Sequence, residues 1–393
     1  MAKRSITDVD VSGKRVLCRV DFNVPLNGSE ITDDTRIRAA LPTIQWLRDH
    51  GARTILCSHL GRPKGKPNDD LRLAPVAARL SELIGQPVRA VGEVTGEAAA
   101  EAVDDLRDGD ILLLENLRFD PREEKNDPSL AQELADLADL YVNDAFGAAH
   151  RAHASTEGVA RLLPAYLGLL MQREVDALGK LLDDPEHPFV AIIGGAKVSD
   201  KLNVLRNLVP RVDTLLIGGG MANTFLAAQG LPVGKSLLEP DLLPAARELT
   251  ALAAGSSVTV ELPSDVVVAS SIDASTGNTR PIDQVGDDAI FDIGPVTIDR
   301  WLGIVAAART IFWNGPLGVA ENPAFANGTG RVAGAVASTD AYTVIGGGDS
   351  VAAVEKLGLA DRIDHISTGG GASLEFLEGV DLPGIAAIPE TSP

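Results

Sequence analysis

Two lysines follow an apolar run that ends in two glycines. The segment Phe189–Lys201 reads FVAIIGGAKVSDK, and Lys197 and Lys201 stand at the start of a pattern that predicts a helix. The amino end of a helix carries a partial positive charge and favours acidic side chains, so lysines are unusual there. At a spacing of four they would share one face of the first turns. Exposed N–H groups and two ammonium groups favour binding of a strong anion, most simply phosphate, although this segment alone also fits two solvated surface lysines.

Glycine clusters end five apolar runs in the second half of the chain. Any one cluster could serve a tight turn or close packing of a helix on a sheet. Glycine also lets a ligand approach backbone N–H groups closely, which phosphate-binding loops exploit. Five clusters at strand ends together predict a nucleotide or polyphosphate site. The clusters are IIGGAK, LIGGGMANTF, WNGPLG, VIGGGDS and STGGGASLE.

Two well-known glycine motifs are absent from these clusters. The dinucleotide fingerprint GxGxxG fails because Asn223 stands where the third glycine should follow Gly218-x-Gly220, which disfavours a dehydrogenase. QGLPVGKS resembles a P-loop but begins with Gln229 and follows a helical pattern. We therefore expect a phosphate site of neither kind.

Acidic residues follow two of the glycine turns. Asp349 in GGGDS is either a helix cap or a Mg²⁺ ligand beside a polyphosphate, with Ser350 offering a hydroxyl to phosphate. One carboxylate suffices in the second case, because magnesium usually takes its remaining oxygens from phosphates and water. Glu321 follows WNGP and, taken alone, reads as a surface acid.

The first half of the chain places arginines and histidines just past its expected strand ends. They occur in RVDFNVP, DDTRIRAA, SHLGRP, ENLRF and GAAHRAHAS. A single arginine there is usually solvated, but several converging arginines suit bidentate capture of phosphate and carboxylate. The side chains past separate strand ends are His59, Arg62, Arg118, His150, Arg151 and His153.

The composition limits the class of protein. The 393 residues are 45% hydrophobic and 23% charged, which predicts a globular chain of two domains. A net charge of −20 disfavours nucleic-acid and anionic-membrane partners and makes the local cationic groups informative. Cys18 and Cys57 lie in apolar runs and read as small buried hydrophobes. There is neither a signal peptide nor a run of ~18 apolar residues, so we expect a cytoplasmic protein.

Short apolar runs alternate with longer amphipathic stretches. The runs are apolar on both faces, which predicts parallel strands buried between helices and an α/β fold of two doubly wound, Rossmann-like domains. A helix at Leu170–Leu182 would join a domain of residues 1–170 to one of residues 171–375, with a proline-rich tail, 376–393, returning to the first domain as an extended strap. The expected strands are Arg15–Phe22, Thr54–His59, Val88–Val91, Ile111–Asn116, Leu140–Phe146, Phe189–Gly194, Thr214–Gly218, Val258–Ala269, Thr310–Asn314, Tyr342–Gly346 and His365–Thr368.

In their order along the chain, RVDFNVP, SHLGRP, ENLRF, AHRAHAS, GGAKVSDK, GGGMANTF, WNGPLGVAE, GGGDS and STGGGASLE resemble the phosphoglycerate kinase family. The resemblance covers essentially the whole chain. It implies a two-domain, usually monomeric glycolytic enzyme that transfers a phosphoryl group reversibly between 1,3-bisphosphoglycerate and MgADP, giving 3-phosphoglycerate and MgATP. Its departures are Ala148, where the family often has Thr or Ser, and Ser350 in place of Thr.

The resemblance also implies roles for particular residues. Lys197 and Arg36, from opposite domains, would flank the transferred group, Asp349 would hold the magnesium, and Glu321 would contact the ribose. The 3-phosphoglycerate ligands would be Asp21, Asn23, Arg36, His59, Arg62, Arg118 and Arg151. The nucleotide ligands would be Gly195, Ala196, Lys201, Gly218, Gly219, Asn314, Pro316, Val319, Glu321, Gly347, Gly348, Asp349 and Ser350.

Phosphoryl transfer needs in-line positioning and positive groups more than covalent chemistry. Backbone N–H groups at Gly348 and Gly371 would add to the charges of Lys197, Arg36 and Mg²⁺. We expect direct transfer without a phosphoenzyme, and domain closure about the connecting helix to exclude water. The alternatives are another ATP-dependent acyl-phosphate kinase, or a catalytically silent nucleotide-binding protein, which the retained polar residues disfavour.

Overall fold

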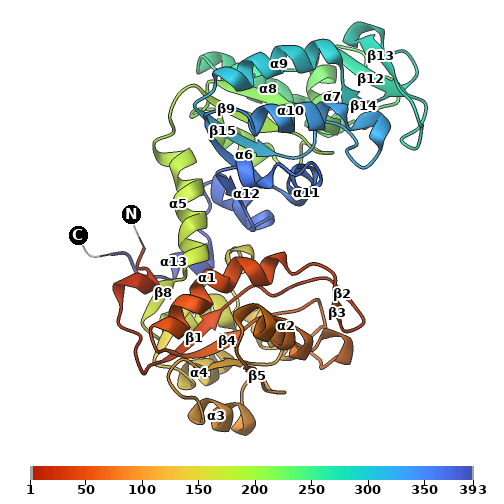
Figure 1. Ribbon diagram of the computed structural model, residues 1–393. Helices are drawn as coiled ribbons and strands as arrows, with labels where there is room; N and C mark the ends of the chain where they lie inside the picture. The colour runs from red at the N-terminus through yellow and green to blue at the C-terminus, as the bar shows by residue number, and fades with distance from the viewer. Residues whose placement is uncertain (1–2, 392–393) are drawn as a thin grey trace. The chain divides into compact units, whose positions relative to one another are not determined.

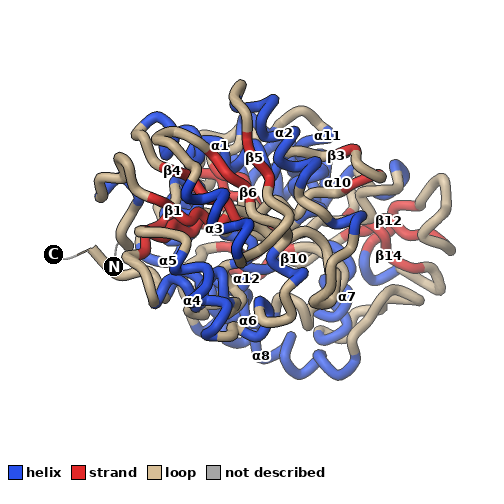
Figure 2. Tube along the Cα trace, turned by 90° about the horizontal axis from the view of Figure 1, so that it is seen from below, coloured by secondary structure: helices blue, strands red, loops and turns tan. Residues whose placement is uncertain are grey.

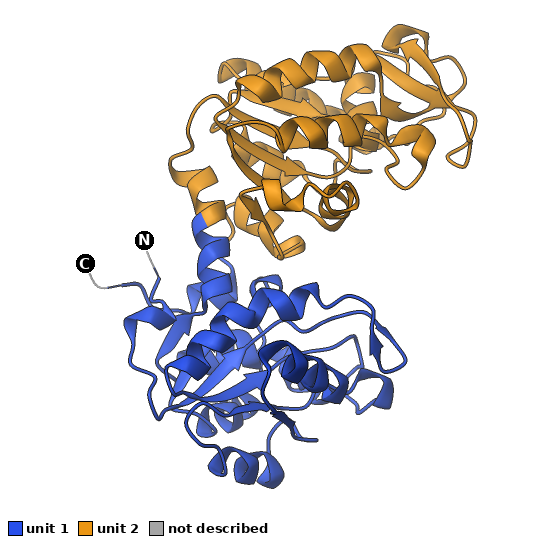
Figure 3. Ribbon diagram, viewed as in Figure 1, with its two compact units in different colours: residues 1–176, 381–393 blue, residues 177–380 orange. Residues whose placement is uncertain are grey.

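Two compact units make up the chain. A computed structural model describes residues 3–391, and its contacts separate residues 1–176 with 381–393 (unit 1) from residues 177–380 (unit 2; Figure 3). The boundary falls inside helix α5, Leu169–Asp183. Each unit contains a six-stranded parallel sheet with helices between its strands (Figure 1), so the expected fold of two doubly wound α/β domains is confirmed.

The sheet of unit 1 has the order β5-β6-β4-β1-β7-β8, and every pairing in it is parallel. Strand β1 lies inside the sheet between β4 and β7, and the strand order reverses between β1 and β7. Val16 and Cys18 of β1 share one buried cluster with Ile37 and Ile44 of α1 and Val76 of α2. The elements are β1 Arg15–Arg19, β4 Arg53–Cys57, β5 Val88–Ala90, β6 Ile111–Leu113, β7 Leu140–Asn143, β8 Ala165–Leu167, the hairpin β2 Leu26–Asn27 and β3 Glu30–Ile31, α1 Thr35–Asp49, α2 Ala74–Ile84, α3 Glu97–Asp104 and α4 Pro128–Asp136.

The sheet of unit 2 repeats this plan with the order β11-β10-β9-β15-β16-β17. All pairings are again parallel, and the order reverses between β9 and β15. The fully buried Trp301 and Trp313 lie in one cluster with Ile192 and Ile345. The elements are β9 Phe189–Ile193, β10 Thr214–Ile217, β11 Thr259–Glu261, β15 Thr310–Asn314, β16 Tyr342–Gly346, β17 His365–Ile366, α6 Leu202–Leu208, α7 Gly219–Ala228, α8 Leu243–Gly255, α9 Pro295–Ala307, α10 Asn327–Val336, α11 Gly348–Lys356 and α12 Gly371–Leu377.

Unit 2 also carries a three-stranded antiparallel sheet of order β13-β12-β14, set beside the main sheet (Figures 1 and 2). The single strand expected at Val258–Ala269 is therefore wrong. Residues 262–264 are not part of a strand and separate two shorter strands. Strand β11 forms an edge of the parallel sheet, and β12 is the centre of the antiparallel one. Strands β13 and β14 lie where the sequence predicted no strand. Their bounds are β12 Asp265–Ala269, β13 Asn278–Pro281 and β14 Ala289–Ile293.

Local chemistry fixes several helix ends. Helix α2 has a proline in its first turn and stops at Gly85, whose φ of 73° is left-handed. Helix α4 follows Asp127, whose side chain accepts from the N–H of Ser129 at 2.8 Å. Helix α9 is capped from a neighbouring strand, because the carboxylate of Asp265 accepts from the N–H of Thr297 at 2.7 Å.

The carboxyl-terminal tail packs on unit 1, as expected. The N–H of Gly384 donates to Ala149 O at 2.8 Å, and Asn143 Nδ2 donates to Gly384 O at 2.9 Å. The expectation of a wholly extended strap is wrong, because residues Pro383–Ala386 form the short helix α13. Among residues 3–391, no helix combines the length and the apolar character that a membrane crossing requires.

Candidate functional site

Three loops at the carboxyl ends of β9, β10 and β15 meet backbone to backbone in unit 2. The N–H of Gly195 donates to Pro316 O at 2.8 Å, and the N–H of Gly219 donates to Leu317 O at 3.0 Å. A Cβ on Gly219, whose φ is +65°, would lie 2.7 Å from the N and O atoms of Gly195. A Cβ on Gly218 would lie 2.6 Å from the Leu317 side chain. These glycines are therefore required by the close approach of the loops to one another.

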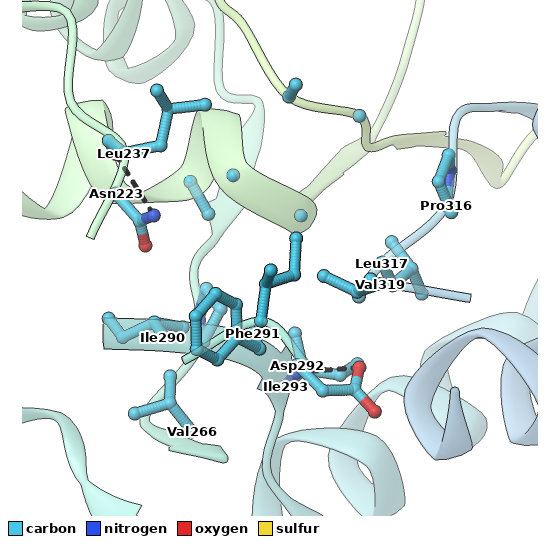
Figure 4. A pocket seen from close by; sticks show the side chains of 18 of the residues that line it. Asn223, Leu237, Val266, Ile290, Phe291, Asp292, Ile293, Pro316, Leu317 and Val319 are labelled. Carbon is cyan, nitrogen blue, oxygen red and sulfur yellow. Dashed lines mark hydrogen bonds between the residues drawn. The ribbon is translucent and has the colours of Figure 1, made fainter. Parts of the chain in front are cut away.

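A pocket of about 290 Å³ opens beside the joined loops. The first turns of α7, strand β14 and the segment after β15 form its walls, and Figure 4 shows their mostly apolar side chains. Seven of the residues expected to bind nucleotide line it, namely Gly195, Ala196, Gly219, Pro316, Val319, Glu321 and Asp349. The expected ligands Lys201, Gly218, Asn314, Gly347, Gly348 and Ser350 are not among its lining residues.

Sequence reasoning missed one wall of this pocket. Phe291 and Asp292 come from β14, a strand that the sequence did not predict, and Asn223 and Leu237 face it from the α7 side. The Asn223 amide donates to Leu237 O at 3.2 Å, and Asp292 accepts from the N–H groups of Ile293 and Gly328 at 2.9 and 2.8 Å (the first drawn in Figure 4). Burial raises the pKa of Asp292 to about 7. In the sequence, this wall was indicated only by the LIGGGMANTF cluster, which contains Asn223.

Lys201 bridges the two strands at which the order of the unit 2 sheet reverses. Its Nζ donates to Gly194 O at 2.8 Å, to Asn314 O at 2.9 Å, and to the Asn314 side-chain oxygen. The side chain is buried, and this burial lowers the pKa of Lys201 to about 8, although Asp349 opposes the shift. The three donors of the ammonium group are thus all used at the end of β9 and β15.

Lys197 differs from Lys201 in its surroundings. Helix α6 begins at Leu202, so the expectation that both lysines occupy the first helical turns is wrong. The Val198–Lys201 segment turns before the helix, and Glu239 holds it by accepting from the N–H of Val198 at 2.6 Å. Lys197 is exposed, as a group that acts on a ligand must be.

Helix α11 begins at Gly348, after Gly347 with a left-handed φ of 87°. Asp349 lies in its first turn and is exposed, so it is not the capping residue. Ser350 is fully buried, and its hydroxyl accepts from the N–H of Gly315 at 2.6 Å and donates to Gly346 O at 3.2 Å. The Ser350 hydroxyl therefore ties β15 to β16, and its predicted bond to phosphate stays a prediction. Gly371 is the first residue of α12.

Asp349 meets the chemical requirement for a magnesium ligand. It is an exposed carboxylate on the pocket wall and acts electrostatically on Lys201. No group of three or more potential metal ligands occurs within residues 3–391. A single exposed carboxylate such as that of Asp349 fits a Mg²⁺ ion that takes its remaining oxygens from phosphates and water.

The expected substrate residues of unit 1 follow four neighbouring strands, β6, β4, β1 and β7. Because these strands are parallel, their carboxyl ends lie on one edge of the sheet. The first residues of α1 add Arg36 beside β1, where its Nη1 donates to Asp21 Oδ2 at 2.9 Å. The residues after the strands are Arg118 (β6), His59 and Arg62 (β4), Asp21 and Asn23 (β1), and Arg151 (β7).

Polar contacts hold this cluster together. Asn23 Oδ1 accepts from the N–H of Gly61 at 2.8 Å, and Arg118 Nη1 donates to Gly61 O at 2.7 Å. Arg118 is buried, and this burial lowers its pKa, as does nearby Arg151, while Glu124 opposes the shift. Arg62 is exposed. Guanidinium groups gathered so closely that Arg151 lowers the pKa of Arg118 favour an anionic ligand.

A buried layer lies beneath the cluster, and sequence reasoning assigned it no role. Arg19 is 1% exposed and donates to Ser155 Oγ at 2.9 Å through Nε and contacts His59 Nδ1 at 3.1 Å through Nη2. Ser155 Oγ in turn donates to Glu123 Oε1 at 2.6 Å. The sequence motif RVDFNVP, which begins with Arg19, could have drawn attention to this buried arginine.

The fold and these sites define a class of protein, a two-unit α/β protein with a cluster of cationic side chains in unit 1 and a mostly apolar pocket beside glycine-rich loops in unit 2. The model of the family described as phosphoglycerate kinase matches residues 6–380. A phosphoglycerate kinase of Moorella thermoacetica is 60% identical over 99% of this chain and 100% of its own length, and one of Thermomicrobium roseum is 57% identical over 98% and 99%.

Solved structures agree with these sequence comparisons. The phosphoglycerate kinase of Coxiella burnetii matches with a TM-score of 0.91 at 43% identity, and that of Pyrococcus horikoshii with 0.83 at 34%. Each match covers 98% of both chains. The chain therefore belongs to the phosphoglycerate kinase family. It is an enzyme, a nucleotide-using kinase of glycolysis.

Proposed function

We propose that unit 1 binds 3-phosphoglycerate or 1,3-bisphosphoglycerate and that unit 2 binds MgATP or MgADP. The cationic cluster around Arg118 and Arg151 supports the assignment of the acid substrate to unit 1, because several guanidinium groups at one sheet edge suit a ligand with phosphate and carboxylate groups. The pocket beside the joined glycine loops carries the second, because its apolar walls suit a base and its Asp349 edge suits a metal-bound phosphate.

The reaction follows from these two positions. In the ATP-forming direction ADP attacks the acyl phosphate, and in the reverse direction the carboxylate of 3-phosphoglycerate attacks the γ-phosphate. The carboxylate of 3-phosphoglycerate and the terminal phosphate of ADP are both largely ionised near neutral pH, so neither direction needs a strong general base. Arg36 and Lys197 bind the equatorial oxygens of the phosphoryl group during a direct in-line transfer. Asp349 would hold a Mg²⁺ ion, which would neutralise charge on the nucleotide phosphates.

The proposal includes closure of the two units about α5 when both substrates are bound, because water must be kept from the transferring group. Small-angle scattering tests this. We expect the radius of gyration to fall when 3-phosphoglycerate and a non-hydrolysable MgATP analogue are added together. An unchanged radius would contradict closure. A covalent phosphoryl-protein trapped during turnover would contradict direct transfer.

The assignment of one substrate to each unit is tested by binding, without turnover. In calorimetric titrations, Arg118→Met should weaken 3-phosphoglycerate and leave MgADP unchanged, whereas Asp349→Asn should weaken MgADP and leave 3-phosphoglycerate unchanged. Each variant is the control for the other. Equal losses of affinity for both ligands in either variant would contradict the assignment.

We also propose that the enzyme acts as a monomer in the cytoplasm, without membrane or nucleic-acid partners.

A further inference from the structure

His59 contacts Arg19, a buried residue whose side chain can only donate hydrogen bonds. Arg19 Nη2 lies 3.1 Å from His59 Nδ1, and both side chains are buried. A guanidinium group has five N–H donors, no acceptor, and keeps its charge in proteins. His59 Nδ1 must therefore accept, which leaves the ring proton on Nε2. Turning the ring over would set a C–H group against Nη2 and leave a buried donor unpaired, which is costly.

Arg19 is itself fixed in place by two contacts besides the one to His59. Its Nε donates to Ser155 Oγ at 2.9 Å, and Nη1 donates to Val20 O. Ser155 is oriented in turn by the fully buried Glu123, which accepts from its hydroxyl at 2.6 Å and from its N–H at 3.0 Å. With Nε and Nη1 occupied in this way, Nη2 has one direction left, toward His59. The orientation of the guanidinium group is therefore set by the fold and not by a ligand.

The charges around His59 act in the same sense. Burial and Arg19 hold the pKa of His59 well below its usual value, and Arg118 and Arg36 add to this, while Asp21 opposes it. An imidazolium ring would place a second N–H against the Arg19 guanidinium. His59 consequently stays neutral over the range in which a free histidine titrates.

We infer that Arg19 is a positioning residue that holds His59 as its neutral Nε2–H tautomer, so that His59 offers the substrate a hydrogen-bond donor and no charge. The two ring nitrogens point in different directions, so Nε2 is directed away from Arg19. The ligand group that it meets is an acceptor of 3-phosphoglycerate, either a carboxylate or a hydroxyl oxygen. This role rests on the proposed binding of 3-phosphoglycerate to unit 1.

A matched pair of substitutions separates a neutral donor from a charged group. The amide of Gln reaches the place of Nε2, whereas the amide of Asn reaches only the place of Nδ1, where its oxygen still accepts from Arg19. His59→Gln should therefore keep the KM for 3-phosphoglycerate within about threefold, and His59→Asn should raise it by roughly tenfold, the effect of about one lost hydrogen bond to a charged group. Equal losses in both variants would show that the imidazolium charge is needed and would overturn the inference.

The tautomer is measured directly by long-range ¹⁵N–¹H NMR of the histidine side chains in the intact enzyme. We expect His59 to show a protonated Nε2 and an unprotonated Nδ1 from pH 8 down to pH 6. In Arg19→Lys, which keeps the charge but cannot bridge Ser155 and His59, the ring should titrate in this range and the KM for 3-phosphoglycerate should become pH-dependent. A protonated Nδ1 in the wild-type enzyme would overturn the inference. If the NMR result holds but neither His59 variant alters KM, the proposed substrate site fails, and the donor role fails with it.

Discussion

The ammonium group of Lys201 donates a hydrogen bond to the backbone oxygen of Asn314 at 2.9 Å and so ties the loop before α6 to the end of β15. Its second backbone partner, Gly194 O at 2.8 Å, belongs to the residue that follows β9. Lys201 thus spans the place where the sheet order reverses, which is where α/β folds bind ligands. The side-chain amide nitrogen of Asn314 is buried without a partner within residues 3–391. A bound phosphate would supply an acceptor for this amide nitrogen and a negative charge beside Lys201.

Nucleotide binding should change the protonation of Lys201. Burial lowers its pKa to about 8, so in the free enzyme the Lys201 side chain is mostly deprotonated above that pH. Nucleotide phosphates beside it favour the charged form and raise the pKa again. Binding of MgADP should therefore take up on the order of half a proton or more at pH 8.5 and almost none at pH 6.5.

Calorimetry in buffers of different ionisation enthalpy measures this uptake. Lys201→Met is the control, because it removes the titrating group and should abolish the difference between the two pH values. Equal uptake at pH 8.5 and pH 6.5 in the wild-type enzyme would contradict the assignment of Lys201 to the phosphates.

Arg36→Ala should lower kcat by roughly 10²-fold or more and leave the affinity for MgADP nearly unchanged, because in the proposed mechanism Arg36 stabilises charge mainly in the transition state. The side chain is held ready by Asp21, which its Nη1 contacts at 2.9 Å. Arg38→Ala is the matched control, since Arg38 lies on the same helix but is exposed and pairs with Asp34 at 2.8 Å. Unchanged turnover in Arg36→Ala would remove Arg36 from the transfer step.

Lys197→Ala should likewise lower kcat by about 10²-fold with little change in the KM for ATP. Lys197 is exposed. Lys356→Ala is the control, because Lys356 is also an exposed lysine and lies at the far end of α11. Steady-state kinetics with both variants measures the contrast. A raised KM for ATP with normal kcat would instead assign Lys197 to ground-state nucleotide binding.

Asp144 should make the stability of unit 1 depend on pH. It is fully buried, its Oδ1 accepts from the N–H of Leu170 at 2.9 Å, and burial raises its pKa to about 7. A carboxyl whose folded pKa is raised ionises later in the folded than in the unfolded chain. Its contribution to stability is therefore present below about pH 4 and is lost as the pH rises to about 7.

Asp144→Asn keeps the acceptor and cannot ionise. Between pH 4 and pH 7 the free energy of unfolding of the variant should fall less steeply than that of the wild type, by up to about 1.4 kcal/mol per pH unit. Hydrogen exchange of the β1 and β7 amides follows unit 1 separately, because a chain of two units need not unfold in one step. Identical slopes would show that Asp144 does not titrate in this range.

The parallel sheets followed from the sequence because their strands are continuous apolar runs with glycine or charged residues at their ends. Strand β14 did not follow, since Ala289–Ile293 has a single short alternation and pairs with β12, not with β13, the strand next to it in sequence. Val258–Ala269 misled because two strands of different sheets adjoin with only Leu262–Ser264 between them.

Residue type was enough to predict that the arginines and Asp349 belong to the candidate sites, but not which residues they contact. Gly218 and Gly219 looked like ligand-binding residues, yet their missing side chains make room for Leu317 and Gly195. Ser350 carries a hydroxyl at the right position in its motif, and only the structure shows that hydroxyl tying β15 to β16. Arg19 acts through His59, and a contact between residues forty positions apart is visible only once β1 and β4 are paired.

The central claim is that this enzyme moves a phosphoryl group between the nucleotide of unit 2 and the acid of unit 1. A coupled assay of ADP release with ATP, Mg²⁺ and either 3-phosphoglycerate or acetate tests it most directly. Turnover should require 3-phosphoglycerate, should fail with acetate, and should be lost when Mg²⁺ is chelated. Equal turnover with acetate, or none with 3-phosphoglycerate, would contradict the account.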